Sequence, residues 1–187
     1  MPSPIGHTLA GFCGYILIHQ QVRRYQRCWL LLSAVLAANL PDLDMLPGLM
    51  VGDPGVFHRQ WTHSLTLAIV TGVLFGQLAR YWKLTRGRWA IWATGLYASH
   101  VLLDMLVADG RPPAGVQLLW PFSTAYYISP ITLFASFNYF DPNLSIVQTL
   151  LNAQNLFAIL REIALIAPFW FVSAHLQNGC HRESDSY

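Results

Sequence analysis

Four apolar runs occupy much of the first part of the chain, and they constrain its fold more than any other feature. The runs cover about Thr8 to Ile18, Cys28 to Leu40, Ser64 to Ala79 and Trp89 to Ala108. A helix that crosses a bilayer needs roughly 20 mostly apolar residues, and about 17 to 25 are common. The third and fourth runs meet this requirement. The first two are short, so they are predicted to form a hairpin that flanking polar residues extend.

The chain carries too little charge for a water-exposed surface of normal size. Of its 187 residues, 54% are hydrophobic and 11% are charged, whereas a soluble domain carries about 25% charged residues. Lipid can cover the apolar faces, because helices satisfy their own backbone hydrogen bonds. Many of the tryptophans lie near the ends of the apolar runs, as in the aromatic belts of membrane proteins. We therefore expect an all-α, polytopic membrane helix bundle with about five spanning or partly spanning helices.

The remainder of the chain is predicted to be less regular. Residues 109–143 are rich in aromatic residues, Pro and Ser, and are expected to form a loop or re-entrant stretch at the membrane interface. Residues 144–176 are predicted to form either one kinked helix or an amphipathic helix followed by a short span. Two charged residues and Pro168 interrupt this region. The polar tail from Gln177 is expected to be frayed.

Basic residues predict the orientation of the bundle. Most of the Lys and Arg residues lie in two short stretches: Arg23, Arg24 and Arg27, then Arg80, Lys83, Arg86 and Arg88. The positive-inside rule places both stretches in the cytoplasm. The first helix then starts outside, the second ends outside, the third starts outside and the fourth ends outside. Neither stretch is long enough to indicate a nucleic-acid partner.

This topology brings most of the His and Asp residues of the apolar region to the outer end of the bundle. The predicted cluster consists of His7, Asp42, Asp44, His58, His63, His100 and Asp104. His100 and Asp104 are spaced i, i+4 and therefore share one helical face. The topology itself was derived from Lys and Arg alone, so it did not impose this convergence.

Ionisable groups in or near a membrane span are costly and usually functional. A divalent cation would compensate the clustered carboxylates, and imidazole nitrogen with carboxylate oxygen suits zinc, manganese or iron. Four histidines and three carboxylates exceed the needs of one tetrahedral zinc. Two ions that share a bridging carboxylate would use them. Such a pair polarises a phosphoryl or acyl oxygen and generates hydroxide near neutral pH.

Each residue of the cluster also has a structural interpretation. Asp42 and Asp44 would end the second helix and cap the next turn, and His63 would belong to an N-cap. Arg59 is either a surface charge or a clamp for an anionic substrate. Three further histidines, His19, His175 and His181, fall outside the cluster and are expected to be structural or solvated. Asp109 is an outer-shell candidate.

The cluster residues belong to short motifs that carry a family resemblance. The motifs are Pro4-Ile-Gly-His7-Thr, Leu40-Pro-Asp42-Leu-Asp44, His58-Arg59-Gln-Trp-Thr62-His63-Ser64 and Ser99-His100-Val-Leu-Leu-Asp104. In this order they resemble the LexA-regulated, membrane-bound family of metal-dependent hydrolases, the YdjM-like inner-membrane proteins. The resemblance covers about residues 1–125, and it implies a multi-pass hydrolase of the inner membrane that uses a metal. The HxxxD motif is also similar to that of zinc-dependent phospholipase C enzymes.

We therefore expect one membrane domain over residues 1–187. Residues 1–125 would form a helical core with the metal site, and residues 126–187 an interfacial loop, a C-terminal helix and a polar tail. The predicted reaction is hydrolysis of an ester or phosphoester, and the position of the site near the headgroups suggests a lipid substrate. Asp44 is a candidate general base. The alternative is a non-enzymatic membrane protein: a metal or proton transporter, or a protein whose metal holds helices together.

Overall fold

A computed structural model describes residues 1–79, 85–108 and 112–184. The helices are α1 (Pro4–Ile18), α2 (Arg27–Asn39), α3 (Met45–Met50), α4 (Leu65–Leu78), α5 (Arg86–Met105), α6 (Ile146–Leu150) and α7 (Ala153–Ser184). Three 3-10 helices link the first elements: η1 (His19–Gln21), η2 (Arg24–Gln26) and η3 (Leu40–Asp44). Two isolated β-bridges occur, but these described ranges contain no strand. The fold is therefore all-α, as expected.

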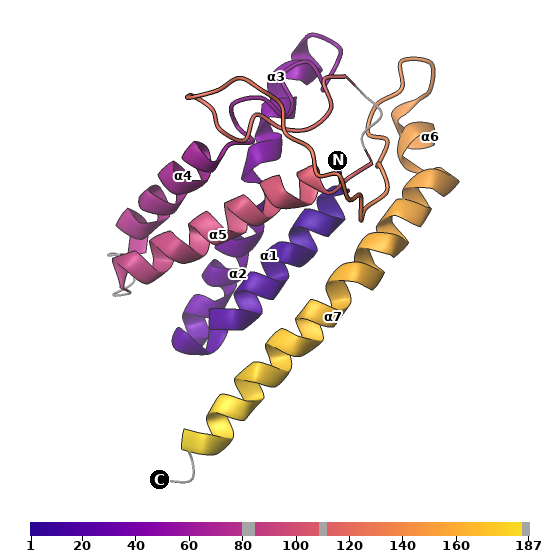
Figure 1. The fold of residues 1–187 in the computed structure, drawn as a ribbon. Helices are drawn as coiled ribbons and strands as arrows, with labels where there is room; N and C mark the ends of the chain where they lie inside the picture. The colour runs from indigo at the N-terminus through magenta and orange to yellow at the C-terminus, as the bar shows by residue number, and fades with distance from the viewer. Residues whose placement is uncertain (80–84, 109–111, 185–187) are drawn as a thin grey trace.

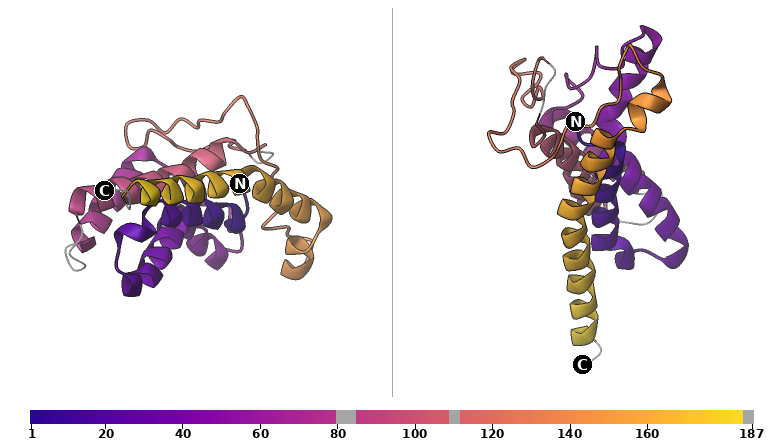
Figure 2. Two further views of the ribbon diagram at one scale, coloured as in Figure 1. Left: turned by 90° about the horizontal axis from the view of Figure 1, so that it is seen from below. Right: turned by 90° about the vertical axis from the view of Figure 1, so that its right-hand side faces the viewer.

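The helices α1, α2, α4 and α5 form a bundle, and the long helix α7 runs along its side against α1 (Figure 1). The right-hand view of Figure 2 shows the C-terminal end of α7 projecting beyond the other helices. Small residues allow the close approach of the helices. A Cβ atom on Gly72 of α4 would lie only 2.5 Å from the carbonyl oxygen of Ala90 in α5.

Two stretches in the described ranges are long and apolar enough to cross a membrane. They are Arg24–Met50, which includes α2 and α3, and Ala153–Val172 within α7. Helix α4 is apolar but shorter, and α5 carries arginines at its start and a buried His and Asp near its end. Length and composition therefore mark two candidate membrane helices, fewer than the five that the sequence led us to expect.

The C-terminal region differs from its prediction. The break between α6 and α7 occurs at Leu151, and the Asn152 side chain then accepts a hydrogen bond of 2.8 Å from the Asn155 backbone. Pro168 lies inside α7 without ending it. Helix α7 continues past Gln177, where the polar tail was expected to begin, and ends at Ser184. Residues 112–145 contain no helix or strand, which agrees with the predicted loop.

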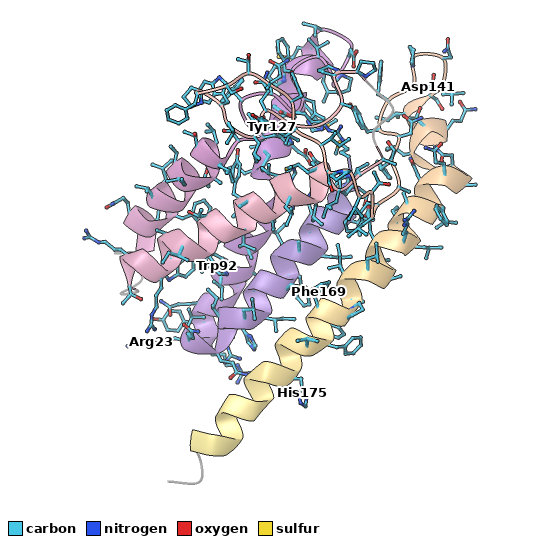
Figure 3. The ribbon with its side chains drawn as sticks, in the orientation of Figure 1. Arg23, Trp92, Tyr127, Asp141, Phe169 and His175 are labelled. Carbon is cyan, nitrogen blue, oxygen red and sulfur yellow. The ribbon has the colours of Figure 1, made fainter. Side chains whose placement is uncertain are left out.

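One end of the bundle is covered by connecting segments and holds the candidate site. The start of α1, the end of α5, helices α3 and α6, and the long loop lie together at this end (Figure 1). Tyr127 and Asp141 mark it in Figure 3, whereas Arg23 lies at the opposite end and His175 far along α7. The described basic residues of both stretches thus lie away from the site. Arg80 and Lys83 are outside the described residues.

Candidate metal centre

Four separate elements bring the candidate residues to one point. The N-terminal turn of α1 supplies His7, η3 supplies Asp42 and Asp44, the segment before α4 supplies His58 and His63, and α5 supplies His100 and Asp104. The Ser3 side chain caps α1 by accepting a hydrogen bond from the Gly6 backbone, so the helix begins before His7 and includes it in its first turn. The side chains of all seven residues are at most 14% exposed. The structure therefore places the whole predicted cluster in the interior of the protein.

The central group consists of Asp42, His63, His100 and Asp104, and one ligand atom from each lies within 4.8 Å of the others. His63 Nε2 is 3.1 Å from Asp104 Oδ2 and 3.2 Å from His100 Nε2. His100 Nε2 is 3.3 Å from Asp42 Oδ1. Two imidazole nitrogens and two carboxylate oxygens converging in this way match the donors and number of a tetrahedral zinc site.

His7 adjoins this group as a fifth candidate. Its ring stacks on the ring of His100 with centroids 3.7 Å apart. Its Nε2 atom is 3.6 Å from Asp104 Oδ1. Neither ring nitrogen of His7 has a hydrogen-bond partner among the described residues, although the residue is fully buried. Only a modest rearrangement would bring His7 into contact with an ion at the central group.

Asp44 organises a second group around His58 and His63. Its Oδ1 atom is 2.9 Å from His58 Nδ1, and its Oδ2 atom is 3.3 Å from His63 Nδ1. The Thr62 hydroxyl donates to Oδ2 at 2.5 Å, and the Arg59 backbone donates to the same atom at 3.2 Å. Sequence reasoning did not single out Thr62. Its position beside His63 in the same motif was the sequence signal that could have identified it.

The capping alternatives for these residues were wrong. Asp44 occupies the N-cap position of α3 but makes no side-chain capping bond. Helix α4 is capped by the Ser64 side chain, which accepts from the Leu67 backbone, and His63 takes no part in the cap. Pro41 lies within the first turn of η3 and does produce the bend after α2. The side chains of Asp44 and His63 therefore contact the cluster and do not cap a helix.

Hydrogen bonds outside the central group fix the histidine rings. His100 Nδ1 lies 2.7 Å from the carbonyl oxygen of Ala38, so it donates a proton and leaves the lone pair of Nε2 directed at the group. The Tyr97 hydroxyl donates to the Thr62 carbonyl at 2.6 Å and supports the segment that carries His63. Such outer contacts are typical of built metal sites, because they set the tautomer and orientation of each ligand.

The central group fits a divalent cation chemically. Both carboxylate oxygens of Asp42 and of Asp104 are buried without a hydrogen-bond partner in the described chain. Burial alone would lower the pKa of His63, but the carboxylates of Asp104, Asp42 and Asp44 raise it well above the ordinary value. The surroundings thus strongly favour a positive charge at this point. A metal ion would supply that charge and give the carboxylate oxygens partners.

Arg59 has an unusual backbone between two cluster histidines. Its φ angle is 66°, the one positive value among the described residues other than glycine. Its carbonyl accepts from the Gln117 backbone at 3.2 Å, and its Nε atom is 3.9 Å from Asp104 Oδ2. Left-handed backbone in a long side-chain residue is costly and is often found at functional sites. The conformation carries the buried guanidinium toward the central group.

A cavity of about 610 Å³ adjoins the cluster. Its lining includes His58, Arg59, Asp53, Val56, Asn138 and Tyr139. His58 Nε2 is buried and has no hydrogen-bond partner in the described part of the chain. Burial lowers the pKa of His58, and the hydrogen bond from its other nitrogen to Asp44 opposes this shift. The cavity therefore leads to a neutral imidazole beside the candidate metal centre.

Glu162 is a buried residue of α7 whose role sequence reasoning missed. It accepts hydrogen bonds from the backbone and the hydroxyl of Ser3, the first at 2.6 Å. It also packs against Gly6, where an added Cβ atom would lie 2.7 Å from Glu162 Oε2. The signal was present in the sequence: a carboxylate in an apolar helix needs a partner. This contact ties α7 to the turn of α1 that precedes His7.

The remaining candidates lie elsewhere. The ring of His19 stacks on Tyr15 and its Nδ1 atom is 2.8 Å from the Ile16 carbonyl oxygen, which is a local structural role. His175 is exposed and lies far from the site (Figure 3). Asp109 and the side chain of His181 are outside the described residues.

Comparison with known proteins agrees with the motifs. A family model described as YdjM inner membrane protein matches residues 1–179. The chain belongs to the YdjM family. The YdjM family model covers the helical bundle, the candidate metal centre and most of α7. Sequence reasoning had extended the resemblance to this family only to about residue 125.

Two relatives from Escherichia coli (strain K12) carry names that match this assignment. The inner membrane protein YbcI is 33% identical over 135 residues, which are 70% of this chain and 73% of the relative. The inner membrane protein YdjM is 36% identical over 104 residues, 48% of this chain and 47% of the relative. No solved structure matches the chain. Family membership thus places the protein among inner membrane proteins and leaves its chemistry to be argued from the site.

Proposed function

We propose that this protein is a membrane-bound, metal-dependent hydrolase that acts on an ester or phosphoester at the outer face of the inner membrane. One observation carries the proposal: a buried group of His and Asp residues, whose Asp42 and Asp104 oxygens accept no hydrogen bond from the described residues, lies beside a cavity that reaches His58. A site that only held helices together would have no need of the adjoining cavity.

In this proposal Asp42, His63, His100 and Asp104 hold the ion, with His7 as an additional ligand. Zinc suits these donors best, and manganese or iron also accept them. When bound, a divalent cation polarises the ester oxygen and lowers the pKa of a water molecule toward neutrality. The low exposure of the group strengthens its electrostatic interactions by keeping bulk water away.

His58 and Asp44 act as a pair in this reaction. The bond between His58 Nδ1 and Asp44 Oδ1 orients the ring of a residue that lines the cavity, and Nε2 has no hydrogen-bond partner among the described residues. A neutral imidazole in this setting accepts a proton from the attacking water and returns it to the leaving group. We therefore assign the general base to His58. Asp44 orients it, because the Asp44 oxygens are already engaged by His58, Thr62 and the Arg59 backbone.

Arg59 is proposed to bind the negative charge of the substrate. It lines the cavity and its guanidinium approaches the central carboxylate of Asp104. A planar guanidinium recognises phosphate or carboxylate oxygens through paired hydrogen bonds. This arrangement favours a phosphoester over a neutral ester.

We further propose that residues 1–187 form one multi-pass membrane domain in which α1, α2, α4, α5 and α7 all enter the bilayer. Helix α5 has 20 residues and reaches about 30 Å, the thickness of the hydrocarbon core. Helices α1 and α4 are shorter and would span with help from flanking residues or local thinning. The basic ends would face the cytoplasm, so the metal centre would lie near the outer headgroups.

The pattern of ionisable residues disfavours the transporter alternative. A transporter needs polar groups throughout the depth of the membrane. Between Arg88 and His100, α5 contains no His, Asp, Glu, Lys or Arg, and α4 contains none over its whole length. The buried His and Asp residues instead gather at one end, as an enzyme acting at the membrane surface requires.

The test is hydrolysis by purified protein in detergent. We expect turnover of a chromogenic phosphodiester or of short-chain phospholipids that chelation abolishes and zinc or manganese restores. His58→Ala should remove turnover and keep the bound metal, whereas His19→Ala should change neither. A protein that binds metal but hydrolyses no ester or phosphoester under these conditions would contradict the proposed function.

A further inference from the structure

Among the described residues that line the cavity beside His58, the side chains of Arg59 and Asp53 carry charges of opposite sign. Arg59 contributes a cation next to the metal centre, and Asp53 contributes a carboxylate on another part of the lining. The rest of the described lining combines neutral polar residues such as Asn138 with apolar residues such as Phe137. A ligand with an anionic group near Arg59 and a cationic group near Asp53 would complement both side chains.

Local structure holds Asp53 in place. Its Oδ1 atom accepts from the Gly55 backbone at 2.8 Å, and its own backbone donates to the Gly48 carbonyl at 3.0 Å. The first bond forms an Asx-type turn that fixes the carboxylate at the cavity without neutralising its charge. A cationic group of a ligand can therefore pair with it.

The surroundings of the cavity are apolar and exposed. Val56, which lines the cavity, and the adjacent Phe57 are 47% and 40% exposed. In the preceding helix α3, Leu46, Leu49 and Met50 are 56%, 57% and 89% exposed. Exposed apolar residues beside a polar cavity are typical of proteins that take a ligand from a membrane surface.

We propose that this cavity binds a phosphodiester that carries an ammonium group, with the phosphate at Arg59 and His58 and the ammonium at Asp53. The chemistry is that of an aminoalcohol phospholipid headgroup or of the corresponding soluble glycerophosphodiester. The inference rests on the proposed function, because it names the substrate class of the same site. The apolar surroundings favour the lipid as the source.

The experiment is calorimetric titration of the purified full-length chain in detergent with two short-chain lipids. Dihexanoyl phosphatidylethanolamine carries the ammonium group, and dihexanoyl phosphatidylglycerol carries hydroxyls instead. We expect the first to bind about tenfold more tightly, as one charge-assisted hydrogen bond provides. Equal affinities, or tighter binding of the glycerol lipid, would overturn the inference.

Two variants locate the selectivity. Asp53→Asn keeps an oxygen for the Gly55 backbone but removes the negative charge. The affinity for the ethanolamine lipid should then exceed that for the glycerol lipid by less than about twofold. Asp141→Asn is the matched control, because Asp141 makes the same kind of turn with the Asn143 backbone at 2.9 Å and is absent from the cavity lining. Asp53→Glu should restore part of the preference. A preference that survives Asp53→Asn would contradict the assignment.

Two further arms separate the possible outcomes. Glycerophosphoethanolamine binding as tightly as the lipid would support the ammonium phosphodiester chemistry and assign it a soluble source. Mass spectrometry of the recovered lipid reports hydrolysis independently of binding. Selective binding without hydrolysis would uphold this inference and refute the proposed reaction, whereas hydrolysis of both lipids without selectivity would do the reverse.

Discussion

At the scale of single residues, Asp44 connects most of the site. It contacts His58, His63 and Thr62 through its side chain and the Arg59 backbone through Oδ2. A carboxylate that orients two histidines raises their basicity and fixes their rings. We therefore expect Asp44 to affect metal binding through the orientation of these two histidines.

Asp44→Asn is expected to weaken metal binding without abolishing it. Loss of a carboxylate that orients ligands lowers metal affinity by about 10- to 100-fold in comparable sites. Competition with a fluorescent chelator measures this change in purified protein. The control is Asp141→Asn, which should bind as the wild type does. An unchanged affinity in Asp44→Asn would show that the carboxylate does not orient the ligands.

His63 makes metal binding dependent on pH. Nearby carboxylates raise its pKa in the metal-free protein despite burial, so an entering ion must displace a proton. Below that pKa the proton competes with the metal, and above it the competition ends. The apparent affinity should therefore fall as the pH is lowered and level off at higher pH. Chelator competition over a series of buffers tests this, and an affinity independent of pH would contradict it.

Sequence could predict which residues meet but not what each one does. The i, i+4 spacing of His100 and Asp104 and the positive-inside rule were sufficient to bring the cluster to one end. The division of roles between Asp42 and Asp44 depends on which oxygen faces which imidazole. That geometry arises from the bend at η3 and the left-handed backbone of Arg59, which apolar patterning cannot reveal.

At the scale of elements, contacts between helices decide where the ligands stand. Helices α4 and α5 pack closely at Gly72, which faces the carbonyl of Ala90 and the side chain of Thr94. The apolar runs predicted these helices well, because length and composition determine them. The short helix α3 and the break before α7 were missed, since α3 ends in local backbone hydrogen bonds from Val51 and the break carries one turn bond between Asn155 and Asn152.

A pair of glycine substitutions tests the contact between α4 and α5. A Cβ atom at Gly72 would meet the Ala90 carbonyl oxygen at 2.5 Å, whereas one at Gly95 would meet nothing within 4 Å. Gly72→Ala should therefore destabilise the protein by about 1–3 kcal/mol through overpacking. Gly95→Ala should be neutral or stabilising by up to about 1 kcal/mol, because alanine favours helix. Thermal unfolding in detergent compares them, and equal effects would argue against the close packing.

Glu162 provides a second test at this scale. Glu162→Ala leaves the buried backbone and hydroxyl donors of Ser3 without an acceptor, at a cost of about 1–3 kcal/mol. Glu162→Gln keeps one acceptor oxygen and should lose less. The melting temperature in detergent measures both. If both variants melt as the wild type does, Glu162 does not hold α7 to the start of α1.

At the scale of the whole molecule, the arrangement separates charge along the bundle. Arg23 of the first stretch lies at one end of the bundle (Figure 3), and the described part of the second stretch lies in the first turn of α5, whose last turns carry two residues of the cluster. Reporter fusions after Arg24 and after Arg86 should therefore report the cytoplasm, and a fusion near Pro54 the opposite side. If Arg24 and Pro54 report the same side, the stretch Arg24–Met50 does not cross the membrane.

The central claim is that the buried His and Asp cluster holds a divalent metal, and metal analysis of the purified protein tests it most directly. Elemental mass spectrometry after exhaustive dialysis in detergent should find about one or more equivalents of zinc, manganese or iron per chain. Asp104→Ala should lose this metal, and His175→Ala, altered far from the site, should retain it. Wild-type protein without stoichiometric metal, or folded Asp104→Ala that keeps all of it, would contradict the account.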